Sequence, residues 1–70
     1  MATAAGAAIQ RLREQHGMSI RALARAADVD HTYISRIESG EAANPSARVL
    51  RDIAAALGTS LTELERRAGR

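Results

Sequence analysis

The chain has 70 residues, a formal net charge of +2, and neither cysteine, phenylalanine nor tryptophan. A chain of this length supports one domain, which we expect to span residues 1–70. Without cysteine it has no disulfide or thiolate metal site, and its two histidines do not suggest a zinc centre, so we expect neither a metal nor a cofactor. No apolar run approaches the roughly 18 residues of a membrane span. The N-terminus lacks the order of a signal peptide, so we expect a cytoplasmic location without membrane contact.

The charge gives only weak support for a nucleic-acid partner. All ten basic residues are arginines, and they are spread along the chain among eight acidic residues, so that no segment is strongly basic. Composition alone therefore does not establish nucleic-acid binding. The large apolar residues are almost all Ile, Leu and Val, accompanied by many Ala, and no segment has the alternation of a strand. We expect an all-α fold of closely packed helices.

The first helix is expected to begin between Thr3 and Gly6 and to run to His16, before the stop signal Gly17. We interpret His16 as a partly buried or C-terminal capping residue and not as a ligand. Apolar side chains at helical spacing form the inward face of this helix, which comprises Ala5, Ala8 or Ile9, and Leu12.

Residues 19–40, SIRALARAADVDHTYISRIESG, carry the most informative pattern in the chain. Ser19 can cap one short helix, and the segment Asp28-Val29-Asp30 is long enough only for a turn. Asp30 can cap a second helix because its carboxylate accepts hydrogen bonds from free N–H groups, and Gly40 can end that helix. The two inward sets are Ile20, Leu23, Ala24 and Ala27, followed by Val29, Ile34 and Ile37. This order predicts a helix-turn-helix, a motif whose second helix enters DNA.

Two further helices are expected after this motif. The fourth ends at Gly58, and its start is marked by Asn44-Pro45-Ser46, where Pro45 suits the first helical position and either Asn44 or Ser46 can be the cap. The fifth opens with the capping-box sequence Ser60-Leu61-Thr62-Glu63 and turns Leu61 and Leu64 inward. Residues 65–70 are expected to form a frayed tail. The inward face of the fourth helix comprises Leu50, Ile53, Ala54 and Leu57.

Many positions match a known pattern in register: Ile9, Leu12, Arg13, Gly17, Met18, Ser19, Leu23, Ala24, Val29, Ile34, Ser35, Ile37, Glu38, Gly40, Asn44-Pro45-Ser46, Leu57-Gly58 and Leu64. Through them the chain resembles the lambda repressor and Cro-like family of bacterial and phage regulators, also called the xenobiotic-response-element (XRE) family. The block YISRIESG over residues 33–40 is the most specific part. The resemblance implies a compact five-helix DNA-binding domain with the helix-turn-helix at its second and third helices.

The sequence departs from the family pattern at three positions. Where the family usually has a Gln that grips a phosphate this chain has Ile20, although the N–H groups at the helix N-terminus can still contact phosphate. The turn position that is commonly Gly is Asp28, which tolerates a left-handed conformation. Glu41 begins a loop that often begins with a base. These departures indicate either a modest affinity for DNA or phosphate contacts that Arg21 and Arg48 supply instead.

The candidates for base contact are His31, Thr32 and Arg36, which the second helix of the motif presents outward. Arg36 can make a bidentate contact to guanine O6 and N7, worth about 1–3 kcal/mol of discrimination; the alternative is a solvated arginine paired with a nearby acid. His31 can contact a base edge as a neutral imidazole, or can be an ordinary exposed residue. Thr32 offers a methyl to thymine and a hydroxyl to phosphate, and the backbone contact is favoured.

The candidates for backbone contact are Ser19, Arg21, Tyr33, Ser39 and Arg48, of which Ser19, Arg21 and Ser39 can equally be plain surface. Tyr33 is expected to combine packing against the core with a hydroxyl directed at a phosphate. The resemblance further implies an ion pair between Arg13 and Glu38. We interpret that pair as structural, because desolvation cancels much of its attraction.

These observations favour a sequence-specific double-stranded DNA-binding transcriptional regulator, expected to be a repressor. It would act as a homodimer in the major groove, paired through the Leu61–Leu64 helix and the loop after Gly40, as relatives pair. The alternative is a protein-binding module of the same fold, such as an antitoxin or a regulatory adaptor. The near-neutral charge and Ile20 favour the alternative, and the polar set on the second helix of the motif opposes it. An enzyme is not expected, because no phosphate-binding glycine loop or nucleophile–base spacing occurs.

Overall fold

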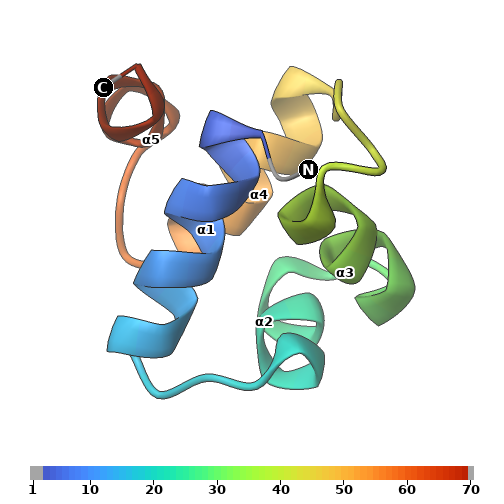
Figure 1. Cartoon of the computed structure of the whole chain (residues 1–70). Helices are drawn as coiled ribbons and strands as arrows, with labels where there is room; N and C mark the ends of the chain where they lie inside the picture. The colour runs from blue at the N-terminus through green and yellow to red at the C-terminus, as the bar shows by residue number, and fades with distance from the viewer. Residues whose placement is uncertain (1–2, 70) are drawn as a thin grey trace.

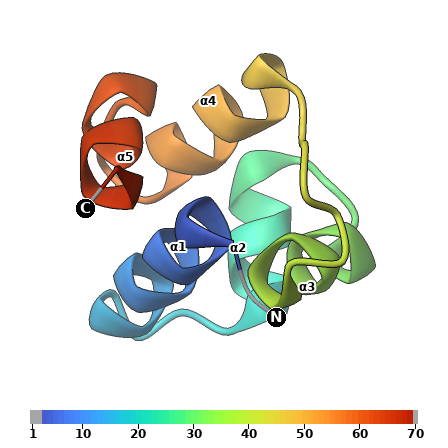
Figure 2. The same cartoon turned by 45° about the horizontal axis from the view of Figure 1, so that its top comes forward.

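The computed structural model describes residues 3–69, over which the chain forms five α-helices and no strand. They are α1 (Ala4–Gln15), α2 (Ile20–Ala27), α3 (His31–Ser39), α4 (Ala47–Ala56) and α5 (Leu61–Ala68). Helix α3 packs against α1 and α2, while α5 packs against α1 and α4. Figure 1 and Figure 2 show α3 and α5 on opposite sides of the molecule, with α1 between them. The all-α class predicted from the sequence is confirmed.

Each helix begins directly after a side chain whose oxygen accepts a hydrogen bond from an N–H group of the first turn. These capping residues are Thr3, Ser19, Asp30, Ser46 and Ser60. Ser46, and not Asn44, is therefore the cap of α4. Pro45 precedes this cap, so its expected place at the first helical position was wrong. Local sequence determines these starts because a Ser, Thr or Asp oxygen satisfies an N–H group that has no partner within the helix.

Helices α1, α2 and α4 end in the same way. A left-handed residue follows the last turn, and the N–H of the next residue donates to a carbonyl five residues earlier, which is the Schellman arrangement. The left-handed residues are Gly17, Asp28 and Gly58, with φ values of 67°, 59° and 71°. The bonds run from Met18 to Arg13 (3.0 Å), from Val29 to Ala24 (2.9 Å) and from Thr59 to Ala54 (2.9 Å).

Helix α5 is longer than expected. Glu63 pairs with Arg66 at 3.0 Å and with Arg67 at 3.3 Å, and these spacings of three and four residues support a helix. Residues 65–68 are consequently helical, and the prediction that they fray was wrong. Residue 70 lies outside the described residues.

The core lies where the five helices meet and contains only aliphatic side chains among the residues described. Its fully buried members come from every helix: Ala8, Ile9, Leu12, Leu23, Ala24, Ala27, Ile34, Ile37, Ile53, Ala54, Leu57 and Leu64. Ile20 and Leu50, both predicted to face inward, are half-buried against this core. Over residues 3–69 no helix combines the length and the apolar character needed to cross a membrane.

Helices α1 and α3 cross closely at Gly6. A Cβ atom at this position would overlap the carbonyl oxygen of Ile37. That oxygen is also the acceptor for the N–H of Gly40 at 3.2 Å, so it is fixed by the end of α3. The lack of a side chain at Gly6 thus allows α1 to lie directly on the backbone of α3.

Candidate nucleic-acid interface

The turn between α2 and α3 places the start of α3 on the surface of the molecule. Asp28 adopts a left-handed conformation, and Asp30 then caps α3 by accepting from the backbone N–H of Thr32 at 2.8 Å. The hydroxyl of Thr32 donates to the same carboxylate oxygen at 2.6 Å. These two bonds, the hydroxyl first and the backbone N–H second, lower the pKa of Asp30 below its ordinary value.

One side of α3 faces away from the protein. Thr32, Ser35, Arg36 and Ser39 are exposed, while Ile34, Ile37 and Glu38 are buried. His31 and Tyr33 are half-buried, and Tyr33 packs against the core. In Figure 1 and Figure 2, α3 lies at the edge of the molecule with its outer side uncovered by the other described helices. The polar face that the sequence predicted is therefore open to a large partner.

The hydroxyl of Thr32 is engaged within the protein. It donates to Asp30 and so strengthens the cap of α3. A phosphate contact from this hydroxyl would have to replace its bond to Asp30, and it stays a prediction. A methyl contact from Thr32 to a thymine stays a prediction.

Arg36 has the longest side chain on the open side of α3. Its side chain is 63% exposed, and its Nε lies 4.0 Å from Oε2 of Glu41, whose side chain is 70% exposed. A pair this exposed and this loose is weak, because solvent screens it. The guanidinium therefore stays available for a planar acceptor pair such as a guanine edge, although it has the acidic neighbour that the alternative interpretation required.

Ser39 closes the C-terminal end of α3. Its hydroxyl donates to the carbonyl of Arg36 at 3.1 Å and accepts from the N–H of Glu41 at 3.3 Å. The side chain predicted to contact phosphate thus also shapes the loop that follows α3. Ser19 has a comparable second role, since its hydroxyl accepts from the N–H of Ala22 at 3.0 Å as the cap of α2.

A shallow groove runs between α2 and the start of α3. Arg21 and His31, both predicted to contact DNA, lie along it, and so does Arg25, which the sequence pattern did not single out. The spacing of four residues between Arg21 and Arg25 puts both on one helix face, and this was the signal available in the sequence. Arg48, in the first turn of α4, is exposed but does not line this groove.

Arg13 and Glu38 form a two-point ion pair that holds α3 against α1. The Nε atom of Arg13 donates to Oε2 of Glu38 at 2.7 Å, and Nη2 donates to Oε1 at 3.0 Å. The hydrogen bond to Glu38 is the main reason that the pKa of Arg13 is raised. Since Glu38 belongs to α3, the pair fixes the orientation of the helix that carries Arg36.

His16 links the end of α1 to the end of α4. Its Nε2 lies 2.8 Å from the carbonyl oxygen of Leu57, so the ring N–H donates to that carbonyl. The residue is exposed overall and caps α1 through its backbone. This contact gives His16 a role in helix packing.

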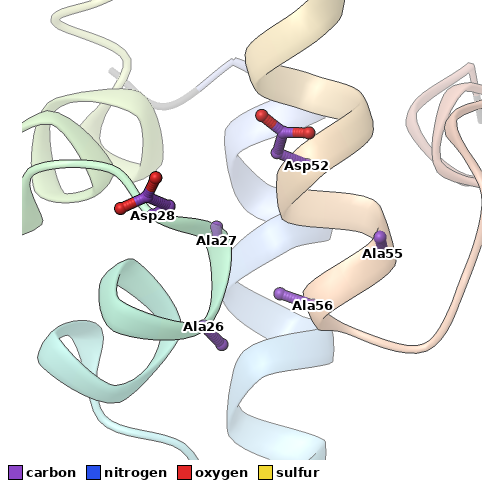
Figure 3. A pocket seen from close by; sticks show the side chains of 6 residues that line it. All are labelled: Ala26, Ala27, Asp28, Asp52, Ala55 and Ala56. Carbon is purple, nitrogen blue, oxygen red and sulfur yellow. The ribbon is translucent and has the colours of Figure 1, made fainter.

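A second hollow lies between the end of α2 and α4. Figure 3 shows the carboxylates of Asp28 and Asp52 at one side of it and alanines along the rest. Two carboxylates without an ion-pair partner among residues 3–69 repel phosphate. The hollow therefore does not extend the candidate interface. Its lining comprises Ala26, Ala27, Asp28, Asp52, Ala55 and Ala56.

Comparison with known proteins establishes the family. A family model described as "Helix-turn-helix" matches residues 9–64, which is most of the chain. The chain belongs to this helix-turn-helix family, and the resemblance to lambda repressor and Cro-like regulators is confirmed.

Individual relatives agree with this assignment. The chain is 41% identical over 59 residues to the HTH-type transcriptional regulator SlrR of Bacillus subtilis (strain 168), a match that covers 84% of this chain. The match covers 39% of SlrR, so the chain spans about two fifths of the length of that curated relative.

Two solved structures are similar to the fold. The clp gene regulator ClgR from Corynebacterium glutamicum has a TM-score of 0.88 and 33% identity, covering 94% of this chain and 69% of that chain. FeII HppE, solved in complex with its substrate, has a TM-score of 0.79 and 30% identity, covering 91% of this chain but 37% of that chain. The five-helix arrangement is thus shared with longer chains.

Proposed function

We propose that the chain is a sequence-specific double-stranded DNA-binding domain of a transcriptional regulator, with repression as its expected action. Helix α3 lies in the major groove, and α2 lies across the phosphate backbone. The relatives named as regulators and the family match support this role. Arg36, His31 and the methyl of Thr32 are the proposed base contacts.

The open outer side of α3 is the observation that carries the proposal. Its exposed side chains are polar or charged, and its apolar ones are used in the core. The Arg13–Glu38 pair and the close crossing at Gly6 hold the inner side of α3 against α1. A stiffly supported helix with a free polar face has the shape and the chemistry to read base edges in the major groove. Arg21, Arg25 and Arg48 are the arginines proposed to neutralise phosphates.

A homodimer on two half-sites about 34 Å apart is the expected assembly. Helix α5, on the side away from α3, offers Leu61 for subunit contact because this side chain is half-buried. Leu64, on the same helix, is only 1% exposed and faces the core as predicted. A dimer contact on α5 therefore depends on Leu61 and the polar residues around it.

We infer that the domain is not an enzyme. The hollow of Figure 3 has two aspartates as its only titratable lining groups. The relatives named as transcriptional regulators support this inference. The iron and substrate of HppE belong to that protein, of which this chain matches only 37%.

The test is a selection of duplexes from a random pool, followed by titration of cognate and unrelated DNA. Arg36→Ala should weaken cognate binding about tenfold or more and unrelated binding much less, because one bidentate base contact is lost. Arg11→Ala removes the same charge at an exposed position of α1 outside the proposed contacts, and it should leave the ratio unchanged. An equal loss on both duplexes would mean that Arg36 holds phosphate and does not read sequence.

Salt dependence separates this function from the alternative of a protein-binding module. A DNA-binding domain loses affinity as salt rises, with a logarithmic slope of about −0.9 for each phosphate neutralised. The near-neutral charge and the half-buried Ile20 favour the alternative. Failure to select any duplex, together with tight binding to a protein such as a toxin, would favour the antitoxin or adaptor role.

A further inference from the structure

An acidic side chain lies beside Arg36, one of the proposed base contacts of α3. Glu41 follows Gly40 at the end of the helix, and its Oε2 is 4.0 Å from Nε of Arg36. Both side chains are more than half exposed and lie on the side of α3 that the proposed function turns toward DNA. A carboxylate at such a place repels phosphates and competes with them for the guanidinium.

The position of Glu41 is fixed by the backbone. Gly40 turns the chain with a φ of 91°, a left-handed value that suits glycine. The N–H of Glu41 donates to the hydroxyl of Ser39 at 3.3 Å, and the N–H of Ala42 donates to the carbonyl of Arg36 at 3.0 Å. These two bonds tie the loop to the last turn of α3, so the backbone of Glu41 is held beside the turn that carries Arg36.

The effect of this carboxylate differs between two kinds of complex. On unrelated DNA, Arg36 can contribute only through a phosphate, and Glu41 weakens that contribution by competing with the phosphate for the guanidinium and by repelling the phosphate. On a cognate site the planar guanidinium engages a guanine edge with two directed hydrogen bonds, which an exposed and screened ion pair does not match. An interface charge of the wrong sign lowers the affinity for poor partners more than for good ones.

We propose that Glu41 is a specificity-determining residue. Its carboxylate competes with phosphates for Arg36 and so weakens binding to non-cognate DNA. This inference rests on the proposed function and adds to it a role for the acidic side chain beside Arg36. It also accounts for the acid at a loop position where the family pattern often has a base.

The experiment compares Glu41→Gln with the wild-type chain on the selected duplex and on unrelated duplexes of equal length. Affinity for unrelated DNA should rise about threefold or more, while cognate affinity should change less than about twofold. Asp52→Asn is the matched control, because it makes the same charge change at an exposed position of α4, in the hollow that is not part of the candidate interface. It should leave the ratio of the two affinities unchanged.

The double variant Arg36→Ala/Glu41→Gln tests whether Glu41 acts through Arg36. If it does, Glu41→Gln no longer raises binding to unrelated DNA when Arg36 is absent. An equal gain on both duplexes, the same shift in Asp52→Asn, or a full effect in the Arg36→Ala background would each overturn the inference. A wild-type chain that selects no duplex overturns the proposed function and this inference together. If the wild type is selective but Glu41→Gln leaves the ratio of cognate to unrelated affinity unchanged, only this inference is overturned.

Discussion

The guanidinium of Arg13 and the carboxylate of Glu38 meet edge to edge, 25 residues apart in sequence, and join α1 to α3. The third donor of Arg13, Nη1, reaches the carbonyl of Met18 at 2.8 Å. One side chain thereby ties together the last turn of α1, the loop before α2 and the helix proposed to enter DNA. With side-chain exposures of 12% and 6%, the pair is shielded from solvent but satisfied by directed bonds.

Removing one partner of this pair should destabilise the chain strongly. In Arg13→Ala, Glu38 keeps a nearly buried charge without a counter-ion, and the free energy of unfolding should fall by about 3 kcal/mol. Urea denaturation followed by circular dichroism measures the change. Arg66→Ala breaks an exposed pair of α5 and should cost less than about 0.5 kcal/mol. A similar small loss for Arg13→Ala would contradict the assigned role.

Replacing both Arg13 and Glu38 shows whether the pair sets the orientation of α3 independently of its effect on the stability of the chain. In Arg13→Met/Glu38→Leu no buried charge is left alone, so stability should recover to within about 1 kcal/mol of the wild type. The directed contact that sets the angle of α3 is still absent. We therefore expect cognate DNA binding to remain weaker than in the wild type even when the variant is fully folded. Wild-type affinity in this stable double variant would show that apolar packing alone orients α3.

The helix starts and most helix ends could be predicted from the sequence because they depend on local chemistry. A Ser, Asp or Gly at a helix boundary acts within about four residues of itself. The Arg13–Glu38 pair came from the family resemblance, since nothing local connects two residues on different helices. The engagement of the Thr32 hydroxyl by Asp30 depends on a rotamer that the sequence does not specify. Arg25 was missed because its role depends on where α3 begins in space.

From the sequence, Gly6 was expected only to lie near the start of the first helix. In the structure it is where α1 lies directly on the backbone of α3. Adding a methyl in a helix interior ordinarily stabilises by up to about 1 kcal/mol. At Gly6 the methyl would meet the fixed carbonyl of Ile37, so Gly6→Ala should instead lower stability by about 2 kcal/mol. Thermal and urea unfolding show whether the free energy of unfolding rises or falls in Gly6→Ala.

Gly17→Ala is the comparison for Gly6→Ala. Gly17 has a φ of 67°, and no atom lies within 4 Å of the place that an added methyl group would occupy. An alanine there carries only the backbone cost of a left-handed residue, about 1 kcal/mol. Gly6→Ala should also reduce DNA binding, because it pushes α3 away from α1. A neutral or stabilising Gly6→Ala would mean that the helices separate without cost.

Asp30→Asn should remove an acid-dependent part of the stability. Hydrogen bonds from Thr32, first the hydroxyl and then the backbone N–H, lower the pKa of Asp30 in the folded chain. The ionised cap therefore favours folding above the unfolded pKa of about 3.9, and this contribution is lost as the pH falls through the lower folded pKa. Asn is also a good cap but does not titrate. Below about pH 4, the stability of Asp30→Asn should accordingly decline less steeply than that of the wild type.

The control for the acid dependence is Thr32→Val, which removes the hydroxyl and keeps the backbone donor. Because the hydroxyl is the first cause of the lowered pKa, this variant should show an intermediate dependence. Urea midpoints measured between neutral and strongly acidic pH provide the comparison. Identical slopes for all three chains would mean that other carboxylates govern acid unfolding.

Asp28 is a non-glycine residue in a left-handed turn, with a φ of 59°, and substitutions there should rank in a definite order. Asp28→Gly should stabilise the chain by about 0.5 kcal/mol, because glycine adopts this conformation freely and no carboxylate remains at the negative end of α2. Asp28→Ala should destabilise it by about 1 kcal/mol. Asp28→Asn keeps the tolerance for the turn and removes only the charge that faces the hollow shared with Asp52 (Figure 3). Its gain should therefore shrink as salt screens that charge, whereas the gain of Asp28→Gly should persist in part at high salt. If alanine proved as stable as glycine, backbone conformation would not limit this turn.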